Sequence, residues 1–265
     1  MDSTNNNPQA KTILITGGTS GIGKATAKYF AKKGYNVIIT GRRKDALETI
    51  AQKLNLKYGA RVKTLCFDVT KKEEVADSLK ALEDGWDVID ILVNNAGGAR
   101  GLEPIQEGDT ADWDYMIDAN VKGLLYMTRM IAPRMVQRGK GHIINLCSTA
   151  GHEVYPNGAV YCASKHAVDA LTKGMRHDLF KHGIRVSQIS PGMVEDTEFA
   201  LNRFKGDEEK AKIYEDITPL NAKDVAELIF FVATRPRHVN IQDVLVMGTQ
   251  QASSTNVDRS GRKYE

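Results

Sequence analysis

The sequence predicts one α/β domain: a doubly wound parallel sheet of about seven strands, flanked by helices on both faces. Short apolar runs alternate with longer amphipathic segments along most of the chain, and this alternation is typical of repeated strand–helix–strand units. The apolar runs are continuous, as in strands that are buried on both sides. No Gly-, Ser- or Pro-rich linker and no internal repeat divides the 265 residues, so we expect a single domain.

The predicted elements alternate from residue 12 to residue 247. A run of apolar residues marks each strand, and apolar residues three and four positions apart mark each helix. The strands are expected at Thr12–Thr16, Asn36–Thr40, Val62–Phe67, Ile89–Val93, His142–Leu146, Arg185–Ile189 and Asp243–Met247. The helices are expected at Gly23–Lys33, Asp45–Tyr58, Lys72–Glu83, Asp112–Gln137, Tyr161–His182 and Lys223–Ala233. The fourth helix is long enough to contain a break.

Three segments depart from this alternation. Residues 1–10 are polar and rich in asparagine; they lack the basic start and apolar stretch of a signal peptide, so we expect a disordered leader. Residues 193–219 are charged and too long for an ordinary connection, which is typical of a lid over an active site; a solvated helical excursion is the alternative. The domain itself is expected at 11–250, and residues 251–265 are expected to form an irregular tail.

Composition and charge exclude several classes of protein. The net charge of +3 is small, whereas nucleic-acid binders concentrate basic residues on one face. The longest apolar runs, such as Ile143–Cys147 and Leu228–Ala233, are too short to span a bilayer. The cysteines lack the spacing of a zinc site or a disulfide framework, and free thiols fit a reducing compartment. We therefore expect a cytoplasmic protein without a metal and without a membrane or nucleic-acid partner.

A glycine-rich loop, Thr16–Gly23, joins the first strand to the first helix. Glycines permit a tight turn and a close approach of the backbone to a ligand, and the free N–H groups at a helix start attract a pyrophosphate. The G-x-x-x-G-x-G spacing differs from the common dinucleotide fingerprint, so a structural turn is the alternative. The position after the first strand favours a cofactor site, with Gly17, Gly21 and Gly23 as candidate contacts.

Two arginines, Arg42 and Arg43, follow the second strand, where an NAD enzyme usually has an acidic residue for the ribose hydroxyls. Arginine forks suit a 2′-phosphate, so the sequence predicts NADP rather than NAD. Both cations also precede a helix, whose dipole disfavours positive charge, and a bound anion would relieve that cost. Asp45 and Glu48 offer the same relief without a ligand, which is the alternative.

Polar residues follow the third and fourth strands as well. Asp68 is placed to meet an adenine amine, or it caps the next helix. The segment Asn94–Gly97 follows the fourth strand, at the carboxyl edge where ligands bind in such sheets; a turn is the alternative. Neither position alone separates a ligand contact from a structural role.

A catalytic constellation is expected at the same edge. Tyr161 and Lys165 are four residues apart and share one face of a predicted helix, and Ser148 follows the fifth strand. Reduction of a carbonyl by hydride needs a proton for the new alkoxide, which a tyrosine hydroxyl supplies. Because the ordinary tyrosine pKa is about 10, we expect Lys165 to lower it, while Ser148 polarises the substrate oxygen.

Together, these motifs and Pro191-Gly192 resemble the short-chain dehydrogenase/reductase family, from about Lys11 to Gln250. The resemblance implies a Rossmann-type fold, oxidoreductase activity on CH–OH groups, and a homotetramer or homodimer. Asn120 matches the family's fourth catalytic residue, which holds a water that links the lysine to solvent. The implied cofactor contacts are Gly17, Thr19, Ser20, Ile22, Arg42, Asp68, Val69, Asn95, Ala96, Gly97, Tyr161, Lys165, Pro191, Gly192 and Val194.

A narrower resemblance points to the NADP-dependent 3-hydroxy acid dehydrogenases. It is carried by Thr197–Phe199, Arg203–Gly206 and Lys223–Ala226. It implies oxidation of serine, allo-threonine and related acids, or reduction of the matching semialdehydes. Arg203 and Lys205 are candidates to meet the substrate carboxylate, and solvated lid charges are the equal alternative. Thr197 lies one residue later than the family's nicotinamide-binding threonine, which puts its role in doubt.

Two other functions stay open. A reductase for another carbonyl, such as a 3-oxoacyl chain on a carrier protein or a pterin, fits the same fold and cofactor. A non-catalytic NADP sensor is a different class, and it predicts the loss of Ser148, Tyr161 or Lys165, all of which are present. The tail after residue 250 is also a candidate to reach the site of a neighbouring subunit.

Overall fold

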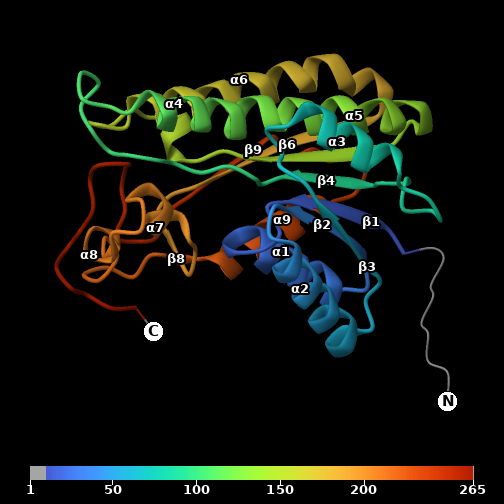
Figure 1. The fold of residues 1–265 in the computed structure, drawn as a ribbon, viewed down its shortest axis with the longest axis horizontal. Coiled ribbons are helices and arrows are strands. Elements are labelled where there is room, and N and C mark those ends of the chain that lie inside the picture. Colours follow the sequence, from blue (N-terminus) through green and yellow to red (C-terminus); the bar gives the residue numbers. More distant parts are fainter. Residues whose placement is uncertain (1–9, 265) are drawn as a thin grey trace.

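The computed structural model describes residues 10–264, and a seven-stranded parallel sheet forms its centre (Figure 1). The strands are β1 Thr12–Thr16, β2 Asn36–Gly41, β3 Val62–Cys66, β4 Ile91–Asn94, β5 Gly141–Leu146, β6 Ile184–Pro191 and β9 Asp243–Val246. Their order is β3-β2-β1-β4-β5-β6-β9. The chain reverses its direction of winding between β1 and β4, and ligands bind at such a switch point. The predicted Rossmann-type architecture is therefore confirmed.

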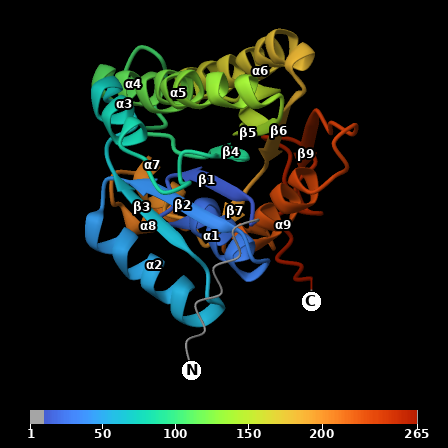
Figure 2. The same ribbon diagram turned by 90° about the vertical axis from the view of Figure 1, so that its right-hand side faces the viewer.

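Helices cover both faces of this sheet, as Figures 1 and 2 show. One face is packed by α1 Gly21–Lys32, α2 Lys44–Tyr58 and α9 Ala222–Ala233. The opposite layer contains α3 Lys72–Lys80, α4 Thr110–Ile117, α5 Gly123–Arg138 and α6 Ala159–Leu179. Each layer encloses its own apolar core. Within residues 10–264, no helix combines the length and the apolar character needed to cross a membrane.

The inner and edge strands differ in burial. Every residue of β1 and β4 is buried, as expected for strands that are covered on both faces. The same expectation is wrong for the edge strands β3 and β9, which expose part of their residues. Leu245 in β9 is 48% exposed, because an edge strand lacks a neighbour on one side and is incompletely covered.

The long predicted helix is broken at a π-helical turn, Asp118–Lys122, between α4 and α5. A π-turn inserts an extra residue into the helical ladder and is frequent at functional sites. Other boundaries differ by a few residues: α1 and α6 each begin two residues earlier than predicted, and α3 ends at Lys80. Such shifts are ordinary at helix ends.

The charged segment 193–219 forms an excursion over the carboxyl edge of the sheet (Figure 1). We call it the lid. Its two ends are joined by the pair β7 Val194–Glu195 and β8 Leu220–Asn221, and it carries the short helices α7 Phe199–Arg203 and α8 Glu208–Ala211.

The C-terminal tail packs on the ends of the lid in its own chain. The Gln250 and Gln251 side chains accept hydrogen bonds from the N–H groups of Thr218 and Met193, at 2.8 Å each. These two contacts tie the tail to both ends of the excursion. Apart from Ala10, the expected leader lies outside the described residues.

Candidate active site

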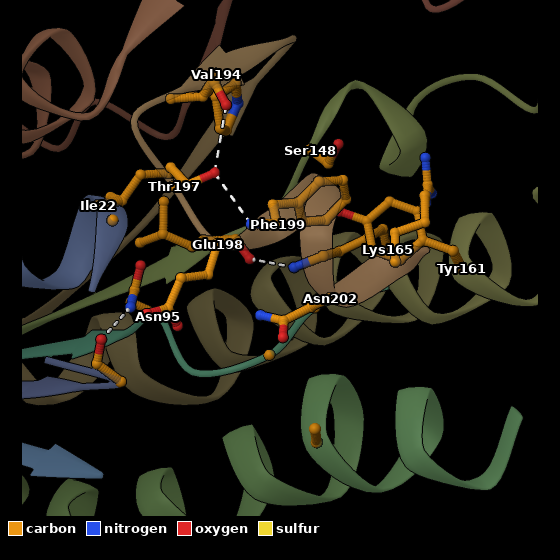
Figure 3. Close-up of a pocket in the computed structure, with 18 of the residues that line it drawn as sticks. Ile22, Asn95, Ser148, Tyr161, Lys165, Val194, Thr197, Glu198, Phe199 and Asn202 are labelled. Atoms are coloured by element: carbon orange, nitrogen blue, oxygen red, sulfur yellow. Dashed lines mark hydrogen bonds between the residues drawn. The ribbon is translucent and has the colours of Figure 1, made fainter. Parts of the chain in front are cut away.

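A cleft of about 820 Å³ opens at the carboxyl edge of the sheet, between the glycine-rich loop, the start of α6 and the lid (Figure 3). Nearly all predicted site residues line it, from both the cofactor set and the catalytic set. Gly23 and Asn120 do not line the cleft. Both contact residues that do line it: Gly23 lies against Gly17, and Asn120 is bonded to Gly98. The cofactor contact expected of Gly23 and the water-holding role expected of Asn120 stay predictions.

The glycine-rich loop has no room for side chains. A Cβ at Gly23 would lie 2.3 Å from the carbonyl oxygen of Gly17, and Gly17 itself has a left-handed backbone with φ of +68°. Ser20, at the N-cap of α1, makes no side-chain cap bond, so the first-turn N–H groups remain available. A close backbone approach beside a helix N-terminus suits a pyrophosphate, and these residues therefore fit a dinucleotide.

The ends of β1 and β4 are locked together beside this loop. The Thr16 hydroxyl accepts hydrogen bonds from the N–H groups of Asn95 (3.0 Å) and Ala96 (2.9 Å). The Asn95 amide donates to the Thr16 carbonyl at 2.8 Å. These bonds fix the segment Asn94–Gly97 at the switch point of the sheet. The segment therefore forms both the turn and part of the cleft wall.

The two arginines after β2 point to different partners. Arg42 is 60% exposed at its side chain and lies 3.7 Å from the Asp68 carboxylate. Arg43 donates to Thr19 Oγ1 and to Glu198 Oε1, at 2.8 Å each. Asp68 also accepts from the N–H and hydroxyl of Thr70, both at 2.9 Å. Asp68 therefore orders the turn before α3, although it does not cap that helix as its alternative expected, and it lines the cleft.

Tyr161, Lys165 and Ser148 meet at the inner end of the cleft (Figure 3). The Lys165 ammonium donates to the carbonyl of Leu146 at 2.9 Å and lies 5.9 Å from the centre of the Tyr161 ring. Burial raises the pKa of Tyr161, and the charge of Arg203 and the hydroxyl of Ser148 oppose that rise. Burial also lowers the pKa of Lys165. The charge of Arg203 is a cause that lowers the pKa of Tyr161, and the expected lowering by Lys165 stays a prediction.

Asn120 lies in the π-turn and is 2% exposed. Its amide oxygen accepts from the Gly98 N–H at 2.8 Å, and its amide nitrogen donates to the Gly98 carbonyl and to Ser164 Oγ, at 2.9 Å each. A Cβ at Gly97 would lie 2.2 Å from this amide oxygen. Asn120 therefore connects the loop after β4 to α6, the helix that carries Tyr161.

The two lid cations that the sequence could not separate have different environments. Arg203 is 8% exposed; it donates to the Tyr155 hydroxyl at 2.7 Å, and its guanidinium lies 5.1 Å from the centres of the Tyr161 and Phe199 rings. Its Nε has no hydrogen-bond partner within residues 10–264. Lys205 is exposed and is paired with Asp109 and Asp112. Arg203 is therefore the cation that faces the cleft.

Several cleft residues were absent from the sequence-based set. Tyr155 and Phe199 pack around the catalytic tyrosine, and Glu198 and Asn202 come from the lid. The tail adds Gln251, Ser254, Thr255, Val257 and Arg259. Tyr155 is an aromatic residue in a Gly- and Pro-containing turn, six residues before Tyr161. This pattern could have marked Tyr155 as a candidate cleft residue. The tail residues carry no signal in the sequence, because only the fold brings them here.

The model of the short chain dehydrogenase family matches residues 11–208. This chain belongs to the short-chain dehydrogenase family. The fold and family that the sequence motifs predict are confirmed. The matched residues include most of those that line the cleft described above.

Relatives of this short-chain dehydrogenase match it over most of its length. NADP-dependent 3-hydroxy acid dehydrogenase YdfG of Salmonella typhi is 45% identical over 250 residues, 94% of this chain and 99% of that protein. Sulfoacetaldehyde reductase 2 of Chromohalobacter salexigens is also 45% identical over 250 residues, which are 93% of this chain and 98% of that protein. The closed form of serine dehydrogenase complexed with NADP⁺ superimposes with a TM-score of 0.88 at 42% identity, over 92% of this chain and 97% of that one. These matches agree with the predicted hydroxy-acid branch.

Proposed function

We propose that this short-chain dehydrogenase transfers a hydride between NADP(H) and a small 3-hydroxy acid, or the corresponding keto acid or semialdehyde. The observation that carries the proposal is Arg203, a buried guanidinium beside the ring of Tyr161. A buried cation needs an anionic partner or a full set of hydrogen bonds. The nearest contact of Arg203 is a neutral phenol, which leaves its charge uncompensated until an anionic substrate enters.

The cofactor end of the cleft is formed by the glycine-rich loop, the Arg42–Arg43 pair and the segment Asn95–Gly97. The N–H groups at the start of α1 would hold the pyrophosphate, and Arg42, exposed beside Asp68, would bind the 2′-phosphate. Pro191, Gly192 and Val194 line the path toward Tyr161. When bound, the nicotinamide supplies or accepts the hydride.

The protein handles the proton. With an ordinary pKa of about 10, which burial raises further, Tyr161 is protonated at neutral pH, so its hydroxyl can protonate the substrate oxygen during reduction. Ser148 donates a hydrogen bond to the same oxygen and polarises it. In the direction of oxidation, Tyr161 must act as a base. Arg203, whose charge lowers the pKa of Tyr161, then favours its phenolate form. We propose that the Lys165 ammonium, 5.9 Å from the ring centre, adds to this effect.

The anionic end of the substrate is held by Arg203. Tyr155 and Phe199 surround the guanidinium and exclude water from it, which strengthens its attraction for a carboxylate. The distance from Arg203 to Tyr161 places the anion close to the reacting carbon, as in a short hydroxy acid. A sulfonate presents the same charge, and one relative is named for a sulfonated aldehyde.

The test is NADP⁺ reduction at alkaline pH, followed by absorbance, with NAD⁺ in parallel. The substrates are L-serine, L-allo-threonine, D-threonine, 3-hydroxybutyrate, 3-hydroxypropionate and 2-hydroxyethanesulfonate, with the methyl ester of 3-hydroxypropionate as the neutral match. We expect turnover of the 3-hydroxy acids and at least about 100-fold lower kcat/KM for the ester. Activity with the ester equal to that with the acid would contradict the proposal.

The Arg203→Leu variant tests the anchor directly. It should raise KM for the acids by about 100-fold, while the weak turnover of the ester, which has no carboxylate to lose, should fall far less and only through the pKa of Tyr161. Lys205→Met is the matched control, since it removes a neighbouring lid cation that is paired with Asp109 and Asp112. If the wild-type protein turns over none of these substrates, the hydroxy-acid proposal is wrong. The next substrates to test are then ketones, pterins and carrier-bound 3-oxoacyl chains in the reducing direction.

We further propose that the protein acts as a cytoplasmic homotetramer or homodimer. The family resemblance supports the assembly. The thiols of Cys66, Cys147 and Cys162 are free, which fits a reducing compartment. Light scattering of the purified protein measures the assembly; a monomeric mass in an active preparation would contradict it.

A further inference from the structure

Arg43 connects the cofactor end of the cleft to the lid. Its guanidinium donates 2.8 Å bonds to Thr19 in the glycine-rich loop and to Glu198 in the lid, a residue 155 positions away in the sequence. The side chains of Arg43 and Glu198 are 50% and 43% exposed. The pair therefore spans the mouth of the cleft, between the two walls that enclose it.

The lid touches the glycine-rich loop at the same place. A Cβ at Gly21 would lie 3.0 Å from the Thr197 methyl group, and the nearby Ser20 hydroxyl helps Arg43 to lower the pKa of Glu198. Thr197 donates to the Val194 carbonyl and accepts from the Phe199 N–H. The turn before α7 is thus fixed on the cofactor side of the cleft.

The same short segment carries the substrate side. Residues 197–204 include Phe199, which packs on Tyr161 at a centroid distance of 5.7 Å, and Arg203. Asp196 and Lys205, which flank the segment, have left-handed backbones with φ of +56° and +52°. Such conformations are unusual for residues with side chains and mark sharp changes of chain direction. One short segment therefore contacts both Arg43 and Tyr161.

A carboxylate at this position has an electrostatic cost. The cleft wall that Glu198 joins is built for phosphate groups, and like charges repel across such distances. The Arg43 guanidinium lowers the pKa of Glu198, so the carboxylate is ionised at neutral pH. If Glu198 did nothing else, its negative charge would weaken the binding of an anionic cofactor.

We infer that Glu198 is a positioning residue: with Arg43 it forms a clasp that holds the lid shut over the bound cofactor. The inference rests on the proposed cofactor site. Arg43 has five N–H donors, and its bonds to Glu198 and Thr19 leave others free for an anion. Arg42, which faces Asp68, is left as the primary phosphate contact. Closing the clasp also sets α7, and with it Phe199 and Arg203, against Tyr161.

The direct test is the rate of NADPH release, measured by stopped-flow fluorescence. Glu198→Gln keeps the size of the side chain and removes its charge. We expect release about 3- to 10-fold faster than from the wild type, although the substitution removes a negative charge from an anion site. Simple electrostatic repulsion predicts the opposite sign, so equal or slower release would overturn the clasp.

Two further variants separate the clasp from other effects. Glu209→Gln makes the same chemical change in the same lid, where Glu209 is 82% exposed and pairs only with the nearby Lys212; its release rate should match the wild type within about twofold. In an Arg43→Met background, Glu198→Gln should no longer speed release; release should be equal or slower, because only the removal of a repelling charge remains. An undiminished effect in that background would also overturn the proposal.

A second measurement reports on the lid itself. Trypsin cleaves after lysine, and Lys210 in α8 and Lys212 in the turn after it are such sites. NADPH should slow cleavage at both sites in the wild type, and it should slow cleavage much less in Glu198→Gln. The denaturant midpoint of the cofactor-free variant should stay unchanged, because the pair is half-exposed. If the wild type fails to bind NADPH, the proposed function fails; if it binds and Glu198→Gln is normal, only the clasp fails.

Discussion

Tyr161 lies among groups that act on its pKa in opposite directions. Burial and the neighbouring Tyr155 raise the pKa, while Arg203 and Ser148 lower it. Lys165 is held by the Leu146 carbonyl, so its main contact is with the backbone and not with the phenol. The residue pattern identified this tyrosine as the acid, but the balance of burial and charge around it required the fold.

The two arginines proposed to bind the cofactor, Arg42 and Arg43, have different partners in the structure. The sequence places them side by side, whereas the structure gives Arg42 an exposed position at the cleft and joins Arg43 to the lid. Arg42→Ala should weaken NADP⁺ binding by about 10- to 100-fold and change NAD⁺ binding by about twofold or less. Isothermal titration with both cofactors measures this. Equal losses for the two cofactors would remove the 2′-phosphate role.

At the scale of the elements, the π-turn positions a residue that does not touch the cleft. The extra residue at Asp118–Lys122 turns Asn120 toward Gly98 and Ser164. The apolar periodicity predicted one helix that was long enough to contain a break, but the periodicity did not indicate the position of that break. A π-turn is stabilised by contacts outside its own helix, so the local pattern cannot locate it.

Asn120→Ala should lower both stability and cofactor affinity. The substitution removes the partners of the Gly98 N–H and carbonyl at a partly buried position, which costs about 1 to 2 kcal/mol of unfolding free energy. Urea titration and NADPH binding are the measurements. Asn55→Ala, in α2 and away from the cleft, is the control: it removes one bond to the Ala60 carbonyl and should leave NADPH affinity unchanged. Normal NADPH affinity in Asn120→Ala would contradict the positioning role.

At the scale of the whole molecule, the order of strands and helices could be predicted because each element carries its own pattern. The inner strands matched their apolar runs, and the motifs fell at the switch point where β1 meets β4. Contacts such as Arg43–Glu198, and the approach of the tail to the lid ends, join segments that are far apart in the sequence. A single sequence gives no record of such pairs, so they appear only when the chain is folded.

The whole molecule should also lose stability in mild acid because of His142. This side chain is 2% exposed, its Nε2 lies 2.8 Å from Ser187 Oγ, and burial lowers its pKa to about 3. The unfolded chain, with an ordinary histidine pKa near 6.5, binds the proton first as pH falls. The neutral His142 therefore stabilises the native state fully above about pH 6.5. This contribution to the free energy of unfolding is lost below that pH, by about 1.5 kcal/mol between pH 6.5 and 5.

His142→Gln removes the titrating group and keeps a donor for Ser187. Urea titrations of both proteins across this pH range give the measurement, since other groups titrate alike in the two. The wild type should lose about 1.5 kcal/mol more than the variant. Parallel pH profiles for the two proteins would show that His142 does not stay neutral in the native state.

The central claim is that Tyr161 exchanges the proton while the surrounding cleft holds cofactor and substrate. The measurement that tests it most directly is kcat and NADPH affinity of Tyr161→Phe, beside Tyr155→Phe as the matched control. Tyr161→Phe should lose about 10²- to 10⁴-fold in kcat and still bind NADPH. Tyr155→Phe, which removes the hydroxyl that accepts from Arg203, should raise substrate KM and retain turnover. Substantial turnover by Tyr161→Phe would contradict the account.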